Sequence, residues 1–71
     1  MTNHPPITNC LRSLRERNGK MSQAELAKAI GVTRQTVIAI EQGRYSPSLE
    51  SAFRISRVFS VGIEDVFGWE G

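Results

Sequence analysis

Seventy-one residues are enough for one small domain and exclude a two-lobed protein, because a chain of this size buries only about 60% of the surface of its unfolded state. Leu, Ile, Val and Phe supply 18 residues, enough for a compact core and too many for a disordered tail. The net charge is +2, but the charges are unevenly distributed along the chain. Residues 1–57 hold all nine Lys and Arg against four Glu, whereas residues 58–71 hold three acidic and no basic residues. This distribution predicts either a polyanion-binding surface set apart from an acidic end or an evenly solvated basic body.

Cysteine usage and hydropathy indicate a cytoplasmic protein. The single Cys10 has no partner for an intramolecular disulfide, which fits a reducing compartment. No apolar stretch approaches the ~20 residues that cross a bilayer, and residues 1–6 lack the features of a signal peptide. We therefore expect a protein that is neither exported nor embedded in a membrane.

The first predicted element is a helix over residues 8–18, with Thr8 as its candidate N-cap. It follows a polar, proline-containing arm at residues 1–7 that holds the only histidine, His4. The apolar stripe of this helix has helical spacing and consists of Ile7, Cys10, Leu11 and Leu14. Cys10 is expected to be a small core side chain.

Two short helices come next, separated by only about three residues. Ser22 and Glu25 have the spacing of a capping box that starts the first of them, and Thr33 opens the second. Gly31 and Gly43 end them. Their inward residues are Leu26, Ala27 and Ile30 on the first and Val37 and Ile40 on the second. A connection this short through glycine makes the helices cross steeply, which is the helix-turn-helix arrangement.

The C-terminal third predicts two more helices. Ser48 caps a helix that runs to about residue 59. Its apolar face is Leu49, Ala52, Phe53, Ser56 and Phe59. A short helical turn follows from Ile63 to Phe67 and is ended by Gly68. Alternatively, Ile7 and the end at Gly68 and Trp69 form a brief extended pair. The expected fold is all-α with five helices, with a short pairing of the termini as an option.

Three motifs carry a resemblance to a known family. They are Gln23-Ala24-Glu25-Leu26-Ala27, Gly31-Val32-Thr33-Arg34-Gln35-Thr36-Val37 and Ile40-Glu41-Gln42-Gly43-Arg44. From about Leu11 to Trp69 the chain resembles the Cro and phage-repressor type of helix-turn-helix regulator, also called the xenobiotic-response-element family, in its minimal form. The resemblance implies a lambda-repressor-like domain over residues 8–71 that binds double-stranded DNA. Residues 18–21 form a loop one residue longer than is usual in that family.

The outward face of the third helix has the residue types that contact bases. It consists of Arg34, Gln35, Ile38 and Ala39. Arginine pairs with guanine, glutamine with adenine, and aliphatic groups contact the thymine methyl; the resemblance likewise makes the start of this helix the base-reading element. The alternatives are a solvated helix start for Arg34 and Gln35, packing on a neighbouring helix for Ile38, and helix propensity alone for Ala39.

Phosphate contacts are expected on both sides of this helix. Gln23 stands at the start of the second helix, where unpaired amides attract an anion, and the resemblance makes it a phosphate anchor. The other candidates offer hydroxyl or guanidinium groups and are Thr33, Thr36, Arg44, Tyr45 and Ser46. Gln23 could instead face solvent, and Tyr45 could lie on the core.

The resemblance also implies a structural ion pair between Arg15 and Glu41, so Arg15 is expected to hold the scaffold rather than DNA. Arg12 and Arg17 are expected to be surface charges. The isolated His4 and Cys10 provide neither a metal site nor a catalytic set. We therefore expect no cofactor and no enzymatic activity.

The C-terminal segment holds more apolar surface than a five-helix core of this size requires. The candidate self-association residues are Val61, Ile63, Phe67 and Trp69, although Phe67 and Trp69 could instead close the core of the monomer. A homodimer would read an inverted repeat with two recognition helices. The expected function is a sequence-specific transcriptional repressor; the alternative is the antitoxin of a toxin–antitoxin pair, with the toxin as protein partner.

Overall fold

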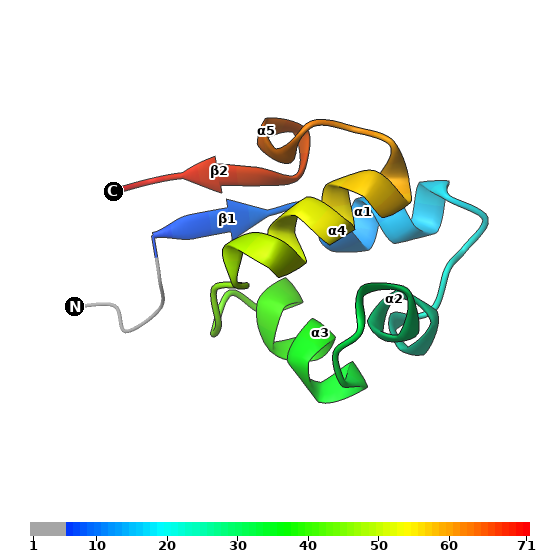
Figure 1. The fold of residues 1–71 in the computed structure, drawn as a ribbon. Coiled ribbons are helices and arrows are strands. Elements are labelled where there is room, and N and C mark those ends of the chain that lie inside the picture. Colours follow the sequence, from blue (N-terminus) through cyan, green and yellow to red (C-terminus); the bar gives the residue numbers. More distant parts are fainter. Residues whose placement is uncertain (1–5) are drawn as a thin grey trace.

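Five helices and two short strands follow one another in a single bundle (Figure 1). Their order is β1 (Ile7–Asn9), α1 (Leu11–Arg17), α2 (Gln23–Ile30), α3 (Arg34–Glu41), α4 (Leu49–Phe59), α5 (Ile63–Val66) and β2 (Phe67–Trp69). The structure is a computed structural model that describes residues 6–71. Most of the expected arm, including His4, therefore lies outside the described residues, while Ile7 belongs to β1.

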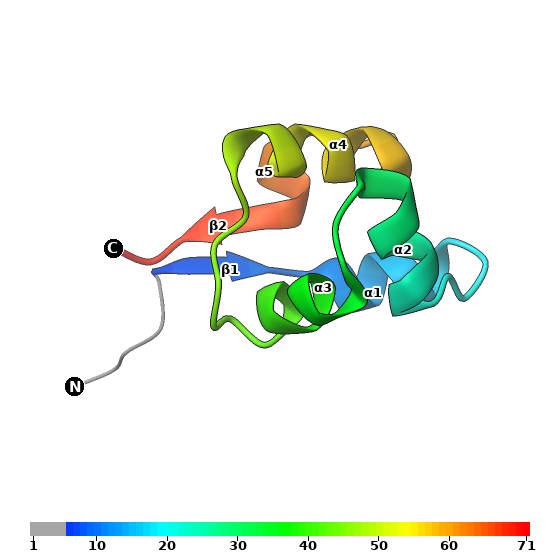
Figure 2. The ribbon, with the colours of Figure 1, turned by 60° about the horizontal axis from the view of Figure 1, so that its bottom comes forward.

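The core lies where the inner faces of the helices meet. It consists of Leu11, Leu14, Leu26, Ala27, Ile30, Val37, Ile40, Ile55 and Val66. Helix α2 packs against both α3 and α4, and α4 packs against α5. Turning the molecule shows α3 projecting on one side while α4 and α5 cover the opposite side (Figure 2). The inward residues expected for α2 and α3 are all buried, so this part of the predicted core is confirmed.

The strands β1 and β2, near the two ends of the chain, pair in antiparallel fashion. This confirms the alternative prediction of a brief extended pair. Ile7 pairs with Trp69, and Thr8 pairs with Gly68. The predicted helix start at residue 8 is therefore wrong: Thr8 is in a strand, and Cys10 is the N-cap of α1 without a side-chain capping bond. The cause is the backbone pairing of β1 with β2; α1 begins after it, where Asn9 Oδ1 accepts the Leu11 amide at 3.1 Å.

In the structure the last helix ends at Val66, one residue before its predicted end at Phe67. Phe67 is extended, with φ −118° and ψ 145°, and Gly68 is in β2 rather than at a helix exit. The strands approach closely there, because a Cβ at Gly68 would lie 2.6 Å from Thr8 Oγ1. Asp65 Oδ2 accepts the Gly62 amide at 3.0 Å and so starts α5.

Helix α4 starts at its predicted cap, and its inward face overlaps the predicted one only in part. Ser48 Oγ accepts the Ser51 amide at 3.1 Å. The buried residues are Ala52, Ile55 and Ser56, whereas Leu49 and Phe53 are exposed. Ala52, Ser56 and the half-buried Phe59 belong to the predicted face, so the prediction is wrong in including Leu49 and Phe53 and in omitting Ile55. Packing against α2 and α5 selects the face that includes Ile55.

Candidate nucleic-acid interface

The turn between α2 and α3 sets the orientation of α3. Gly31 has φ +77° and ψ 31°, and its amide and that of Val32 both donate to the Ala27 carbonyl. This left-handed exit ends α2 after the predicted capping box of Ser22 and Glu25, which is formed in both directions. Two residues later, Thr33 caps α3 by accepting the Thr36 amide at 3.1 Å. Helices α2 and α3 therefore cross as a helix-turn-helix.

The predicted outward residues of α3 lie at or near the surface. Arg34 and Gln35 are exposed, and Ile38 and Ala39 one turn later are half-buried. Among the residues that the structure describes, neither Arg34 nor Gln35 makes a side-chain hydrogen bond or ion pair. Their donors and acceptors are thus available to a partner that approaches α3.

Five of the predicted DNA-contacting residues are brought together beside α3. They line a shallow hollow of about 270 Å³ and are Gln35, Thr36, Ala39, Arg44 and Tyr45. Tyr45 is exposed, so its ring does not lie in the core. Arg44 Nε donates to Gln42 Oε1 at 2.8 Å, which leaves its two terminal nitrogens unoccupied. Ser46 is half-buried and does not line this hollow.

Thr33, the cap of α3, and Thr36 in its first turn have one hydroxyl proton between them that is not used in their mutual hydrogen bond. Thr33 Oγ1 and Thr36 Oγ1 are 3.0 Å apart, so one hydroxyl donates to the other. Each hydroxyl carries a single hydrogen. Thr33 Oγ1 also accepts the Thr36 amide. The same two hydroxyl groups therefore serve both the helix cap and any phosphate contact. One hydroxyl proton remains for a phosphate oxygen.

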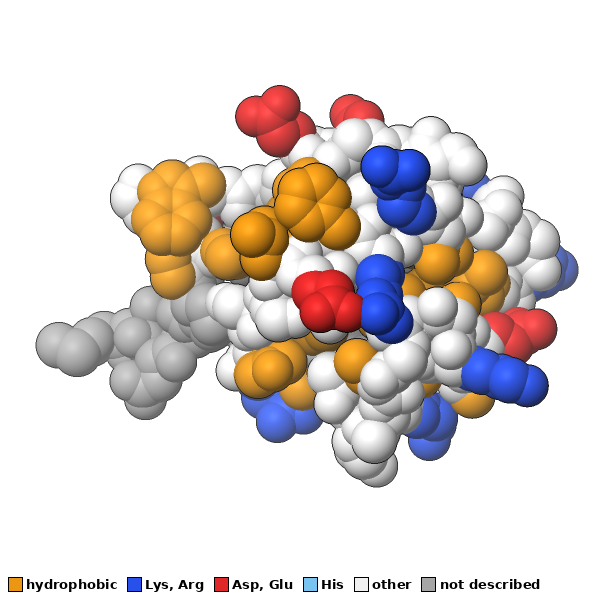
Figure 3. Space-filling model, viewed as in Figure 1, with side chains coloured by type: hydrophobic (Ala, Val, Ile, Leu, Met, Phe, Trp, Pro, Cys, Tyr) orange, Lys and Arg blue, Asp and Glu red, His pale blue; other side chains and the backbone are white. Residues whose placement is uncertain are grey.

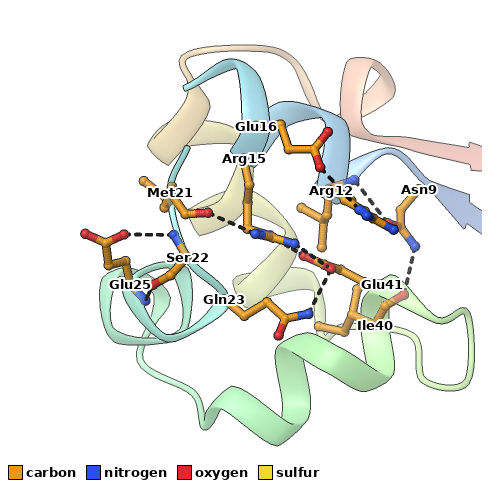
Figure 4. A network of polar contacts seen from close by, with 11 residues as sticks. Asn9, Arg12, Arg15, Glu16, Met21, Ser22, Gln23, Glu25, Ile40 and Glu41 are labelled. Atoms are coloured by element: carbon orange, nitrogen blue, oxygen red, sulfur yellow. Dashed lines mark hydrogen bonds and ion pairs between the residues drawn. The ribbon is translucent and has the colours of Figure 1, made fainter. Parts of the chain in front are cut away.

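Arg15 and Glu41 form an ion pair that ties α1 to α3 (Figure 4). Arg15 Nε donates to Glu41 Oε2 at 2.5 Å and Arg15 Nη2 donates to Glu41 Oε1 at 3.0 Å. Only 12% of the Arg15 side chain and 8% of the Glu41 side chain are exposed. The hydrogen bonds with Glu41 raise the pKa of Arg15 above its ordinary value despite the opposing effect of burial. Arg15 is therefore positively charged at every physiological pH.

Two further contacts of this pair had no local signal in the sequence. Arg15 Nη1 donates to the Met21 carbonyl at 2.9 Å, and Gln23 Nε2 donates to Glu41 Oε1 at 3.1 Å. Similarly, Asn9 Nδ2 donates to the Ile40 carbonyl at 2.8 Å and holds the end of α3. Gln23 thus has one committed amide hydrogen and a second one available for a phosphate.

A larger hollow of about 620 Å³ lies on the other side of α3, between α1 and the start of α2. We call it the α1–α2 hollow. Its lining residues are Arg12, Arg15, Glu16, Ser22, Gln23, Ala24, Arg34, Glu41 and Gln42. It joins the expected phosphate anchor Gln23 to the first residue of α3, Arg34.

The candidate self-association residues fall into two groups. Val61 and Phe67 are half-buried and pack against the core. Trp69 is 70% exposed, and Ile63 lines an apolar hollow with Ile7, Leu49 and Phe67. Figure 3 shows apolar side chains gathered over the strands and the start of α4. This face is made by other elements than the α3 face.

Comparisons with known proteins agree with this geometry. Residues 11–66 match the helix-turn-helix family. An uncharacterized HTH-type transcriptional regulator, YgzD of Bacillus subtilis, is 52% identical over 64 residues, which are 90% of this chain and 96% of that protein. The uncharacterized HTH-type transcriptional regulator MJ0272 of Methanocaldococcus jannaschii is 56% identical over 50 residues, covering 70% of this chain and 76% of that one.

A solved structure has the same fold at low sequence identity. It is a candidate DNA-binding protein from Bacteroides fragilis, with a TM-score of 0.74 and 14% identity, and the match covers 87% of this chain and 98% of that one. The crossing of α2 and α3 defines a helix-turn-helix domain. The chain belongs to the Cro/C1-type helix-turn-helix family. In residues 6–71, none of the helices has the length and apolar character needed to span a membrane.

Proposed function

We propose that this protein is a dimeric repressor that binds an inverted repeat in double-stranded DNA through α3. The observation that carries the proposal is the exposed start of α3. Arg34 and Gln35 have unoccupied hydrogen-bonding groups there, and these are the side-chain types that pair with guanine and adenine in the major groove. Ile38 and Ala39 follow as contacts for thymine methyl groups.

Phosphate contacts on both sides of α3 would fix its position in the groove. Gln23 lies on one side, in the α1–α2 hollow. On the other side are Thr33, Thr36, Arg44, Tyr45 and Ser46. The ion pair of Arg15 with Glu41 supports this arrangement, because it holds α3 against α1 while leaving the outward face of α3 available.

One copy of α3 contacts too few base pairs to define a DNA site. We therefore expect two copies of the protein to bind together as a dimer. The exposed Trp69 and the apolar hollow beside Ile63 offer a surface for a second copy. Val61 and Phe67 would support that surface from the core side. The two recognition helices would then lie about 34 Å apart, one turn of DNA. No feature of residues 6–71 favours a toxin as the partner, so the antitoxin alternative has no support.

The test is selection of bound sequences from a random DNA pool, followed by measurement of the mass of the complex. We expect a symmetric motif and two protein chains per duplex. Arg34→Ala should weaken binding to the selected site by about 1–3 kcal/mol and relax the preference at one base pair. Gln23→Ala should weaken binding to all sequences alike. Equal losses for both variants on selected and unrelated DNA would contradict these roles.

A further inference from the structure

Arg12 lines the α1–α2 hollow, and among residues 6–71 its one side-chain partner is the Glu16 carboxylate of its own helix. We propose that Arg12 is a DNA-phosphate contact and that Glu16 competes with the phosphate for it, which lowers the affinity for DNA. The inference rests on the proposed function and adds α1 to the DNA-binding surface. The sequence alone predicts only a surface charge for Arg12.

The other charged groups of the hollow are already matched. Glu41 accepts from Arg15 and from Gln23, and all three donor nitrogens of Arg15 are engaged. The cations left to neutralise an anion are therefore Arg34, which begins α3, and Arg12. A phosphate held at Gln23 would enter the same hollow as both of them.

The contact between Arg12 and Glu16 is weak enough to be exchanged. Its single hydrogen bond, from Arg12 Nε to Glu16 Oε2, measures 3.3 Å, and 78% and 62% of the two side chains are exposed (Figure 4). An exposed pair four residues apart on a helix contributes little to stability. Within residues 6–71 both terminal nitrogens of Arg12 are without a hydrogen-bond partner, and a guanidinium binds a phosphate through two parallel donors.

Glu16 lines the hollow as well, so it acts in two ways. In the free protein it accepts from Arg12, and in the complex its charge would face the incoming phosphate. Each effect opposes DNA binding. The pair would keep affinity for arbitrary DNA low, because phosphate contacts carry no sequence information.

The chain provides matched controls on other surfaces. Arg17 is also on α1 but lines a different hollow, with Leu14, Phe59 and Val61. Glu50 forms the same kind of pair with Arg54, four residues apart, and lines neither hollow beside α3. Arg12, Arg17, Glu16 and Glu50 are all exposed, so their variants are expected to fold.

The experiment measures the dissociation constant against salt concentration for a selected DNA site and for an unrelated duplex of equal length. Arg12→Ala should weaken binding to both duplexes about three- to fivefold and reduce the slope of log affinity against log salt by about 1. Arg12→Lys should retain the slope, and Arg17→Ala should leave it unchanged. Glu16→Gln should strengthen binding at least about twofold, and Glu50→Gln should not.

A double variant tests the competition itself. The gain from Glu16→Gln should shrink in the Arg12→Ala background, because the two side chains act on one contact. A full gain in that background would overturn the exchange. An unchanged slope in Arg12→Ala, with the wild type binding normally, would overturn the contact. Absence of salt-dependent DNA binding by the wild type would instead refute the proposed function, and with it this inference.

Discussion

Glu41 is the residue on which the interface most depends, because three donors from two helices converge on its carboxylate. Arg15 and Gln23 both donate to it, and the pair of Arg15 and Glu41 is largely buried. Removing one partner of such a pair leaves the other charge desolvated and uncompensated. The geometry of α3 and the position of Gln23 are therefore controlled by one side chain.

Glu41→Ala should lower the free energy of unfolding by about 3 kcal/mol, since it leaves Arg15 with the Met21 carbonyl as its only acceptor. The measurement is urea denaturation followed by circular dichroism. Glu50→Ala removes a carboxylate from an exposed ion pair and should cost less than about 1 kcal/mol. Equal losses in the two variants would show that the buried pair is not structural.

Ser60 is a non-glycine residue in the left-handed region, with φ +55°, at the end of α4. That conformation costs an ordinary residue roughly 1–2 kcal/mol. Ser60→Gly should therefore raise the free energy of unfolding by about 0.5 kcal/mol or more, after the entropy of glycine in the unfolded chain is subtracted. Ser60→Ala removes the same hydroxyl without relieving the backbone, so it should give no gain in thermal denaturation.

At the scale of elements, local signals predicted the helix-turn-helix well and the sheet poorly. Ser22, Thr33 and Gly31 act within one turn of their own helices, so the sequence shows α2 and α3 directly. Strands of three residues have no measurable periodicity, and the pairing of Ile7 with Trp69 depends on the rest of the fold. For the same reason, the direction of the Gln23 side chain toward Glu41 follows from how α1, α2 and α3 cross.

The close approach of β1 and β2 can be tested at Gly68. Gly68→Ala should lower the free energy of unfolding by about 1–2 kcal/mol, because the added methyl group meets Thr8 Oγ1. Thr8→Ala removes that oxygen, so the cost of Gly68→Ala should fall by at least about 0.5 kcal/mol in that background. Chemical denaturation of the two single variants and the double variant gives the coupling. Additive losses would exclude the steric contact.

For the whole molecule, the proposed DNA-binding face and the apolar face are separate. We therefore expect that DNA binding and self-association can be lost independently. Trp69→Ala should convert the proposed dimer to a monomer and weaken binding to the selected DNA site, because Trp69 is exposed and contributes to the apolar face rather than the core. Tyr45→Ala, at the α3 hollow, should weaken DNA binding and retain the dimer. Light scattering after gel filtration measures the mass. A Trp69→Ala variant that stays dimeric would place the self-association surface elsewhere.

The β1–β2 pairing also bears on the order in which the protein folds. It joins residues about 60 positions apart, and closing so long a segment is entropically costly until helical contacts have drawn its ends together. Pairing of β1 with β2 would thus be the last step of folding, after α2 and α3 have packed together. Local opening would begin at the same place, so the amide protons that cross between the strands should exchange with solvent sooner than those inside α2 and α4.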